Sequence, residues 1–278
     1  MLGLVLALGA SVSWGVADYL GGVKSRVVPL LTVIAVSQLS GLVLMAAIAG
    51  ATGSFPDTRT AVYAALGGTA GVIAVAAFYR GMAIGRISIV APVSATGVVL
   101  PVAVGLARGE KPGIIALVGI ALALIGVILA SAESEPGGSP GLATGVPLAL
   151  AAAFGFGVFF LFVAKASEHH QALATTFVLR LTTAPLVLLA LLLLRQPLRV
   201  PPRNLHWLVL VGVLDSGANA LYALATDHGL LSLVSVLGSL YPLTTVLLAQ
   251  ALLREHVSRH QKVGIVAALA GIALISAG

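Results

Sequence analysis

The amino-acid sequence predicts an all-α polytopic membrane protein with ten transmembrane helices arranged as two inverted five-helix repeats. Three observations lead to this prediction: the scarcity of charge, the number of long apolar runs, and the similarity between the two halves of the chain. Of 278 residues, 59% are hydrophobic and only 9% are charged, whereas a soluble domain carries about 25% charged residues. So few charges could not cover a soluble fold of this size, which excludes an ordinary soluble enzyme. Disorder is excluded as well, because it requires low hydrophobicity.

Charge and cysteine content narrow the function classes further. The sequence contains no cysteine, which excludes disulfides, thiolate metal sites and thiol catalysis. The net charge is +6, but no segment is a dense cluster of Lys and Arg. We therefore expect no nucleic-acid partner, and we attribute the basic excess to the positive-inside bias of membrane proteins.

Ten apolar runs supply the transmembrane helices. Most contain close to the roughly 20 residues that a helix needs to cross a bilayer. The runs are apolar on every face, which argues against barrel strands, because these alternate apolar and polar residues. The predicted spans are Leu2–Leu20, Val28–Ala51, Ala61–Ala83, Ile87–Leu106, Gly113–Ala132, Gly141–Ala164, Ala172–Leu194, Leu205–Thr226, Leu230–Leu253 and Val263–Ala277.

The two halves of the chain resemble each other. Residues 1–132 form the first five-helix repeat, 133–140 a polar linker rich in Pro and Gly, and 141–278 the second repeat. The first span matches the sixth at an offset of 142 residues, and the fifth span matches the tenth at an offset of 145. Matched residues include Gly3, Leu6, Gly15 and Val16 with Gly145, Leu148, Gly157 and Val158, and Gly119, Gly126 and Ser131 with Gly264, Gly271 and Ser276.

The repeat has two consequences. Leu2–Leu20 resembles the apolar region of a signal peptide, but it lacks a basic flank and its copy lies in mid-chain, so we expect a retained span. Five spans per half also turn the second half upside down relative to the first. Inverted repeats are common in secondary transporters, whose substrate site lies near the midplane between the halves.

A set of short motifs recurs in order along both halves. They are Ser13-Trp14-Gly15, Gly81 with Ser88-Ile89-Val90-Ala91-Pro92, and Gly109-Glu110 in the first half, and Ser232, Ser235, Leu240-Tyr241-Pro242 and Arg254-Glu255 in the second. On these residues, nearly the whole chain resembles the EamA-type transporters of the drug/metabolite transporter superfamily. The resemblance implies ten helices and transport of small metabolites or amino acids, often outward, without specifying a substrate. The loop before the third span departs from the family pattern, because it holds only Arg59 where the family is often basic.

Three ionisable residues lie inside the predicted spans: Asp18, Arg180 and Asp215. Charges in hydrocarbon are costly and are usually functional. Asn219 and Tyr222 follow Asp215 at four and seven residues, so these three side chains share one helix face. Arg180 and Asp215 lie at similar depths in consecutive spans. Either Arg180 binds a substrate anion while Asp215 exchanges a proton, or the two form a buried pair that only fixes helix packing.

Four further side chains are candidates for the substrate path. Asp18 is either a second proton-coupling carboxylate or an interfacial cap near the end of the first helix. Gln38 either lines the path or hydrogen-bonds between helices. Trp14 and its repeat equivalent Phe156 either stack on the substrate or pack against lipid and neighbouring helices.

Proline residues are expected to interrupt two spans. Pro92 and Pro101 fall in the fourth span and Pro242 in the ninth. Broken helices expose backbone groups to a cavity in many transporters, although membrane helices also tolerate proline as a simple kink. These prolines are therefore candidates for lining a cavity.

Recognised catalytic and metal-binding patterns are missing from the sequence. His256 and His260 have the spacing of a helical metal pair, but no carboxylate pattern surrounds them, so we interpret them as an interfacial pair. There is no P-loop, no Gly-x-Ser-x-Gly elbow and no dinucleotide fingerprint. We expect no cofactor, no bound metal and no ATP-driven transport by this chain alone.

Positive charge is unevenly distributed between the loops. Loops after odd-numbered spans contain ten Lys and Arg residues, and loops after even-numbered spans contain four. The positive-inside rule then places both termini outside, whereas the family resemblance implies cytoplasmic termini. The sequence therefore predicts only that both termini lie on one side of the membrane.

The function predicted from the sequence is a secondary transporter that moves an amino acid or related small metabolite across the cytoplasmic membrane by alternating access. Export is the expected direction. The expected partners are the bilayer, the small-molecule substrate and coupling protons, and the chain is expected to be a monomer or a homodimer. Two alternatives remain: an integral membrane enzyme acting on lipid-linked substrates, with the histidines as its only candidate catalytic residues, and a flippase or receptor on the same scaffold.

Overall fold

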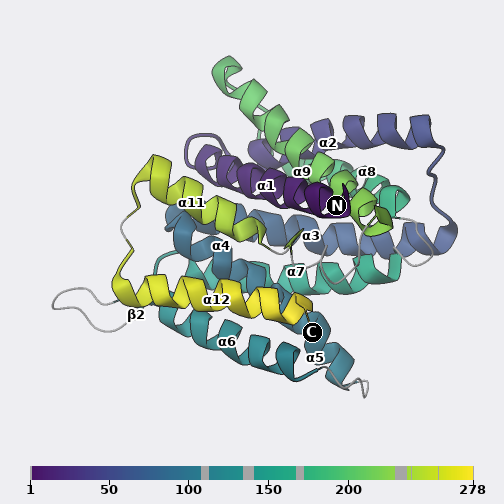
Figure 1. The fold of residues 1–278 in the computed structure, drawn as a ribbon. Helices are drawn as coiled ribbons and strands as arrows, with labels where there is room; N and C mark the ends of the chain where they lie inside the picture. The colour runs from purple at the N-terminus through teal and green to yellow at the C-terminus, as the bar shows by residue number, and fades with distance from the viewer. Residues whose placement is uncertain are drawn as a thin grey trace.

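The computed structural model describes residues 2–107, 113–133, 141–166, 172–228, 237–238, 240–255 and 257–277, and nearly all of them are helical (Figure 1). The helices are α1 (Leu2–Lys24), α2 (Leu30–Thr52), α3 (Thr58–Ile84), α4 (Ile87–Ala95), the 3₁₀ helix η1 (Thr96–Val98), α5 (Val99–Ala107), α6 (Ile114–Ser131), α7 (Val146–Ala166), α8 (Ala172–Leu193), α9 (Pro202–His228), α11 (Tyr241–Leu253) and α12 (Arg259–Ala277). Most of the long helices run side by side in one bundle, and the two ends of the chain lie toward the same end of it (Figure 1).

Five of the described helices are long and apolar enough to cross a membrane: α1, α2, α3, α8 and the Val146–Val163 part of α7. Three shorter apolar stretches cover Ile87–Pro101, Ile114–Ala130 and Tyr241–Leu253. With α9 and α12, these segments account for all ten predicted spans. Many large apolar side chains remain exposed along the bundle, for example Val43 and Ile128, as expected of a surface in contact with lipid. The chain is an all-α, multi-pass membrane protein.

Some predicted span boundaries were wrong by about one helical turn. Helix α1 continues to Lys24 instead of ending at Leu20, because its last turn extends beyond the apolar core, where a basic side chain interacts well with the negative end of the helix dipole. Helix α7 begins at Val146 and not at Gly141, because Gly145 adopts a φ of 90° that a helix cannot contain. Helix α12 likewise begins four residues earlier than predicted.

The predicted linker between the two halves is flanked by a short pair of strands that the sequence did not indicate. Strand β1 (Ala132–Glu133) pairs antiparallel with β2 (Gly141–Leu142). The residues between them lie outside the described part of the chain. The strand pair brings the end of the first half directly beside the start of the second half.

Helices α6 and α12, which end the two halves, pack closely through small residues (Figure 1). A Cβ on Gly119 would lie 2.8 Å from the carbonyl oxygen of Gly271, and one on Gly126 would lie 2.7 Å from that of Gly264. Gly119, the earlier glycine of α6, thus contacts Gly271, the later glycine of α12, and Gly126 contacts the earlier Gly264. The two helices are therefore antiparallel. Gly119 and Gly126 are also the repeat equivalents of Gly264 and Gly271. The halves are therefore inverted with respect to each other.

The remaining helix contacts follow the same symmetry. Helix α1 packs against α9 and α11, and its repeat equivalent α7 packs against α3 and against α4. Helix α2 packs against its own equivalent, α8, while α4 packs against α11. Exchanging the halves maps the contacts of α1 onto those of α7, and it maps the α2–α8 and α4–α11 contacts onto themselves. The fold is a pseudo-twofold arrangement of two inverted repeats.

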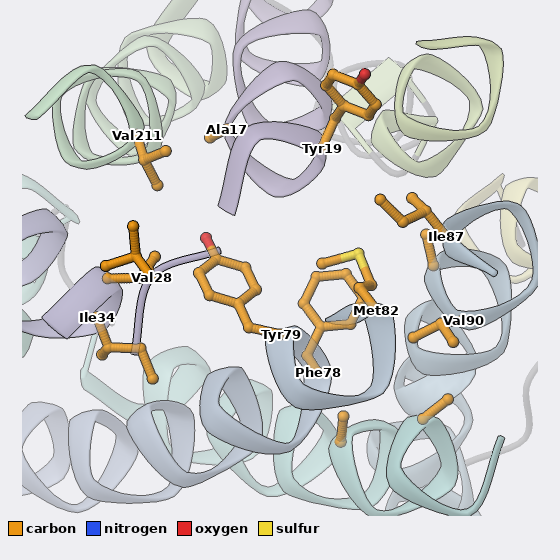
Figure 2. Close-up of a cluster of buried hydrophobic side chains, with 14 of the residues drawn as sticks. Ala17, Tyr19, Val28, Ile34, Phe78, Tyr79, Met82, Ile87, Val90 and Val211 are labelled. Atoms are coloured by element: carbon orange, nitrogen blue, oxygen red, sulfur yellow. The ribbon is translucent and has the colours of Figure 1, made fainter. Parts of the chain in front are cut away.

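The largest buried cluster joins helices of both halves. Phe78, Tyr79 and Met82 of α3 pack among Ala17 of α1 and Ile87 of α4. Figure 2 shows these side chains filling the space between the three helices, with the Tyr79 hydroxyl directed away from Phe78 and Met82 toward Val28 and Val211. The burial of this cluster holds α1, α3 and α4 together at the ends nearest the α3–α4 connection.

Candidate functional site

A hydrogen-bonded group of charged and polar side chains lies in the middle of the bundle. Arg180 of α8 forms an ion pair with Asp215 of α9. The same guanidinium donates to the side-chain carbonyl of Gln38 in α2 at 2.7 Å, and the Thr183 hydroxyl donates to that oxygen at 2.7 Å. Arg180 is 9% exposed, so its charge depends on these partners. The contact between Arg180 and Asp215 that one of the two sequence-based alternatives requires is therefore present, and Gln38 is hydrogen-bonded to the same guanidinium.

Gln38 and Arg180 occupy equivalent positions in the two repeats. They are 142 residues apart, which is the offset that relates the first span to the sixth. The same offset relates Gly41 to Thr183. Two equivalent residues can touch only where the pseudo-twofold axis passes between them. The Gln38–Arg180 hydrogen bond therefore places this site on the axis, at the centre of the interface between the halves.

Two buried polar atoms at this centre have no hydrogen-bond partner among the described residues. They are Nε of Arg180 and the hydroxyl of Ser216, which is itself fully buried. Ser216 lies against Gly41, where a Cβ would overlap its hydroxyl oxygen and lie 3.4 Å from Cδ of Arg180. Unpaired buried polar atoms are uncommon in native proteins, and water or a ligand often satisfies them. The centre thus has unused capacity for hydrogen bonding.

The polar face of α9 continues from the ion pair toward a group of aromatic rings. The Asn219 amide donates to the backbone carbonyl of Asp215 at 2.7 Å, so part of its hydrogen-bonding capacity is used within its own helix. The Tyr222 ring packs against Trp14 of α1 at 5.6 Å between centroids, and Trp14 packs edge-on against Tyr241 of α11 at 6.2 Å. The predicted residues Trp14, Asp215, Asn219 and Tyr222 lie along one α1–α9 interface.

Asp18 lies one turn beyond Trp14 on α1. The alternative that it caps the end of the first helix was wrong, because α1 continues for six residues past it. Its carboxyl group is close enough to Asp215 and to Tyr241 for electrostatic interaction, and Tyr79 interacts with both carboxyl groups. Within the described part of the chain, no hydrogen bond or ion pair holds the Asp18 carboxyl group.

Phe156 lies on the other side of the axis, away from the charged residues. Its ring packs edge-on against Phe78 at 5.7 Å between centroids. Phe156 is the repeat equivalent of Trp14, and Phe78 corresponds to Tyr222 at an offset of 144 residues. The same offset relates Gly68, which packs against the carbonyl of Leu179, to Gly212, which packs against the carbonyl of Ser37. Phe156 therefore belongs to an apolar counterpart of the Trp14–Tyr222 contact.

The three prolines lie within α-helices, two of them near a 3₁₀ turn and one at a helix start. Pro92 lies inside α4 and Pro101 inside α5, on either side of the 3₁₀ turn η1. Pro242 lies in the first turn of α11. Gly97 in η1 packs against α7, where a Cβ would overlap the carbonyl oxygen of Ala153. The break in the fourth span is thus packed closely against a neighbouring helix on this side, and cavity lining by the prolines stays a prediction.

Several candidates from the sequence lie outside the described residues: Gly109, Glu110, Ser232, Ser235 and His256. His260 approaches the hydroxyl of Ser258 at 3.2 Å. No group of three or more His, Cys, Asp or Glu side chains with metal-site geometry occurs among the residues that the structure describes.

Sequence reasoning did not identify Thr183, Tyr79 and Tyr241 as neighbours of the charged group. Thr183 follows Arg180 by one helical turn, so its position on the same face could have been found from spacing alone. Tyr79 and Tyr241 come from other helices, and no local pattern marks them. The Gln38–Arg180 contact did have a signal, which is the 142-residue offset between them.

Two segments of the chain, residues 1–132 and 143–277, match the model of the EamA-like transporter family. The chain belongs to the EamA-like transporter family. The two matches correspond to the two inverted repeats, and this EamA-like protein is accordingly a membrane transporter of the drug/metabolite type, for which membership implies a small-molecule substrate.

Comparison with solved structures supports the same fold. Twenty-two chains match. One of them, described only as the crystal structure of a protein, is 18% identical in sequence, has a TM-score of 0.68, and is matched over 98% of this chain and 95% of its own. Its similarity at this identity bears on the fold alone. No curated protein matches this EamA-like chain.

Proposed function

We propose that this EamA-like protein is a secondary transporter of the cytoplasmic membrane that exports an amino acid or a related small amine by alternating access. The observation that carries the proposal is the position of the Arg180–Asp215–Gln38 group on the pseudo-twofold axis. Residues on that axis are shared by both halves. When one inverted repeat rocks against the other, such a site becomes accessible first from one side of the membrane and then from the other.

The charge of the site favours a substrate with an ammonium group. Arg180 is neutralised by Asp215 and also donates to Gln38, which leaves Asp18 as an additional carboxyl group. Trp14, Tyr222 and Tyr241 add three aromatic rings beside the two carboxyl groups. Aromatic faces attract organic cations, so the site is suited to a protonated amine more than to an isolated anion.

Asp18 and Asp215 are also the candidates for proton coupling. Each is an ionisable group inside a predicted span, and such groups often serve as proton relays in transporters. A proton on one of them and an ammonium group beside them would therefore compete. This competition would couple substrate exit to proton movement in the opposite direction.

The test is counterflow in proteoliposomes preloaded with unlabelled amino acids or amines, measured with the corresponding labelled solute. We expect uptake of the labelled compound by the wild type and none by Asp215→Asn, with the variant remaining folded in detergent. Asp57→Asn is the matched control, because Asp57 caps α3 and lies away from the axis. Normal counterflow by Asp215→Asn would contradict the assignment of this residue. Absence of counterflow for every solute would favour a flippase or receptor.

A further inference from the structure

Glu255, which follows α11 in the second half, binds the beginning of α4 in the first half. One carboxylate oxygen accepts from the backbone N–H of Ile87 at 3.0 Å, and the other accepts from that of Ser88 at 2.9 Å. The first N–H groups of a helix have no partner within the helix. The residue that begins α4, Arg86, makes no side-chain cap. The cap of α4 is therefore supplied by a residue 168 positions away, from the other repeat.

Arg26, in the connection between α1 and α2, holds the same carboxylate and the end of α3. Its guanidinium approaches Glu255 at 3.3 Å and donates to the carbonyl oxygens of Met82 and Gly85 at 3.1 and 3.0 Å. We refer to Arg26, Glu255 and the four backbone groups that they bind as the Glu255 latch. The latch joins the α1–α2 connection, the end of α3, the start of α4 and the end of α11 at one face of the bundle.

The helices are tightly closed behind the latch. Met82 and Ile87, whose backbones take part in it, have fully buried side chains in the same cluster as Ala17 (Figure 2). On the outer side, a cavity of about 500 Å³ is lined by Arg26, Arg86, Glu255 and residues of the end of α3, the α3–α4 connection and the β2–α7 connection. The cavity reaches the latch and its lining includes both charged partners. Glu255 itself is nearly buried, with 9% of its side chain exposed.

We propose that Glu255, with Arg26, keeps this face of the transporter closed, and that these bonds break each time the face opens. The proposal rests on the alternating-access function proposed above. Glu255 acts as a positioning residue, since it touches backbone groups of the opposite repeat and lies away from the axial site. A carboxylate bound by backbone N–H groups of a helix terminus and by a guanidinium is held by charge-assisted hydrogen bonds. Their loss shifts the balance toward the state open at this face.

The sequence contains no cysteine, so a single engineered cysteine reports accessibility without background. Ala17→Cys places a thiol in the cluster behind the latch, at a position that is 1% exposed. We expect Glu255→Gln to increase the rate at which a small maleimide labels this thiol by about tenfold, the change expected from losing one charge-assisted hydrogen bond. Arg26→Gln should produce a smaller increase of the same kind. Asp57→Asn, which removes a helix cap made within one half, should leave the rate unchanged.

A second thiol separates opening of one face from general loosening. Ala64→Cys lies near the opposite end of α3 and is fully buried. Labelling there should stay the same or fall in Glu255→Gln. Unchanged labelling of Ala17→Cys in both Glu255→Gln and Arg26→Gln would overturn the latch, and so would a parallel increase at both thiols. If Glu255→Gln does not fold, Arg26→Gln alone decides the result.

The accessibility experiment needs no substrate, so its result is independent of counterflow. If the latch variants respond as expected but the protein shows no counterflow, the latch proposal is retained and the proposed substrate class is rejected. If counterflow is normal but the latch variants do not change labelling, the proposed transport function is retained and the latch proposal is rejected.

Discussion

The pseudo-twofold axis relates two helix pairs with opposite chemistry. Helix α1 packs against α9, and this interface contains Trp14, Asp18, Asp215 and Tyr222. Helix α7 packs against α3, where the equivalent positions are occupied by Phe156, Phe160, Gly71 and Phe78. One scaffold thus supports a polar and an apolar version of the same interface. The α3–α7 contact forms with no charged side chain at these positions, so pairing of this kind does not itself require charge.

The two interfaces also differ in how closely the helices approach. In the apolar pair, a Cβ on Gly71 would lie 2.8 Å from the Phe159 ring, and one on Gly155 would lie 2.8 Å from Ala74. In the polar pair, the nearest atom to a Cβ on Gly9 is 3.7 Å away. The α3–α7 contact therefore leaves no space for a methyl group at Gly71 or Gly155, whereas the α1–α9 contact has space for one at Gly9.

The largest effect is expected from breaking the axial ion pair. Arg180→Gln leaves Asp215 without its cation inside the bundle, and losing one partner of a buried pair costs about 3–5 kcal/mol. We expect a loss near the lower end, since Asp215 is 31% exposed. Unfolding in detergent with increasing denaturant measures it. The double variant Arg180→Gln/Asp215→Asn should recover part of the loss, and equal stability of the single and double variants would contradict the ion-pair contribution.

Truncating the two equivalent aromatic residues separates packing from recognition. Phe156→Ala removes a ring packed against Phe78 in the apolar interface. Because the ring is only partly buried, we expect the free energy of unfolding to fall by less than the ~3–5 kcal/mol typical of a buried Phe, with normal counterflow of the remaining folded protein. Trp14→Ala should instead weaken substrate affinity, measured as a higher half-saturating concentration in counterflow. The contrast would disappear if both variants changed affinity equally.

Adding a methyl group to each interface tests their difference in packing. Gly71→Ala forces the Phe159 ring to move, and we expect it to destabilise the fold by about 1–2 kcal/mol. Gly9→Ala has space for its methyl group and gains helix propensity, so stability should be unchanged or higher by about 0.5–1 kcal/mol. Thermal unfolding of the two variants in the same detergent provides the comparison. A loss of similar size in both would show that the interfaces are equally tight.

The smallest change in stability is expected at Asp18. Asp18→Asn breaks no hydrogen bond or ion pair within the described residues, so the free energy of unfolding should change by less than about 1 kcal/mol. Transport should nevertheless lose its response to an imposed pH gradient across proteoliposomes. An unaltered response would show that the coupling proton binds elsewhere.

The fold could be predicted from the sequence because lipid imposes simple constraints. Apolar runs of sufficient length must form helices, and an odd number of spans per repeat inverts the second half. The boundaries were less predictable, because Lys24 continues α1 beyond the apolar run and Gly145 delays α7 through its positive φ. Arg180 and Asp215 were identifiable as charges in hydrocarbon. The sequence did not indicate that Tyr79 lies near the charged group or that Glu255 caps α4, because these contacts join segments that are distant in sequence.

The hydrogen bond between Gln38 and Arg180 has an evolutionary consequence. In an assembly of two identical five-helix chains, the same residue would face itself across the axis, and two arginines there would repel each other. Two glutamines could pair, but they would provide no charge. One fused chain with independently varying halves can place a single guanidinium opposite an amide. Fusion of a duplicated gene thus permits one unsymmetrical charge at a point where a symmetrical dimer could have only two like charges or none.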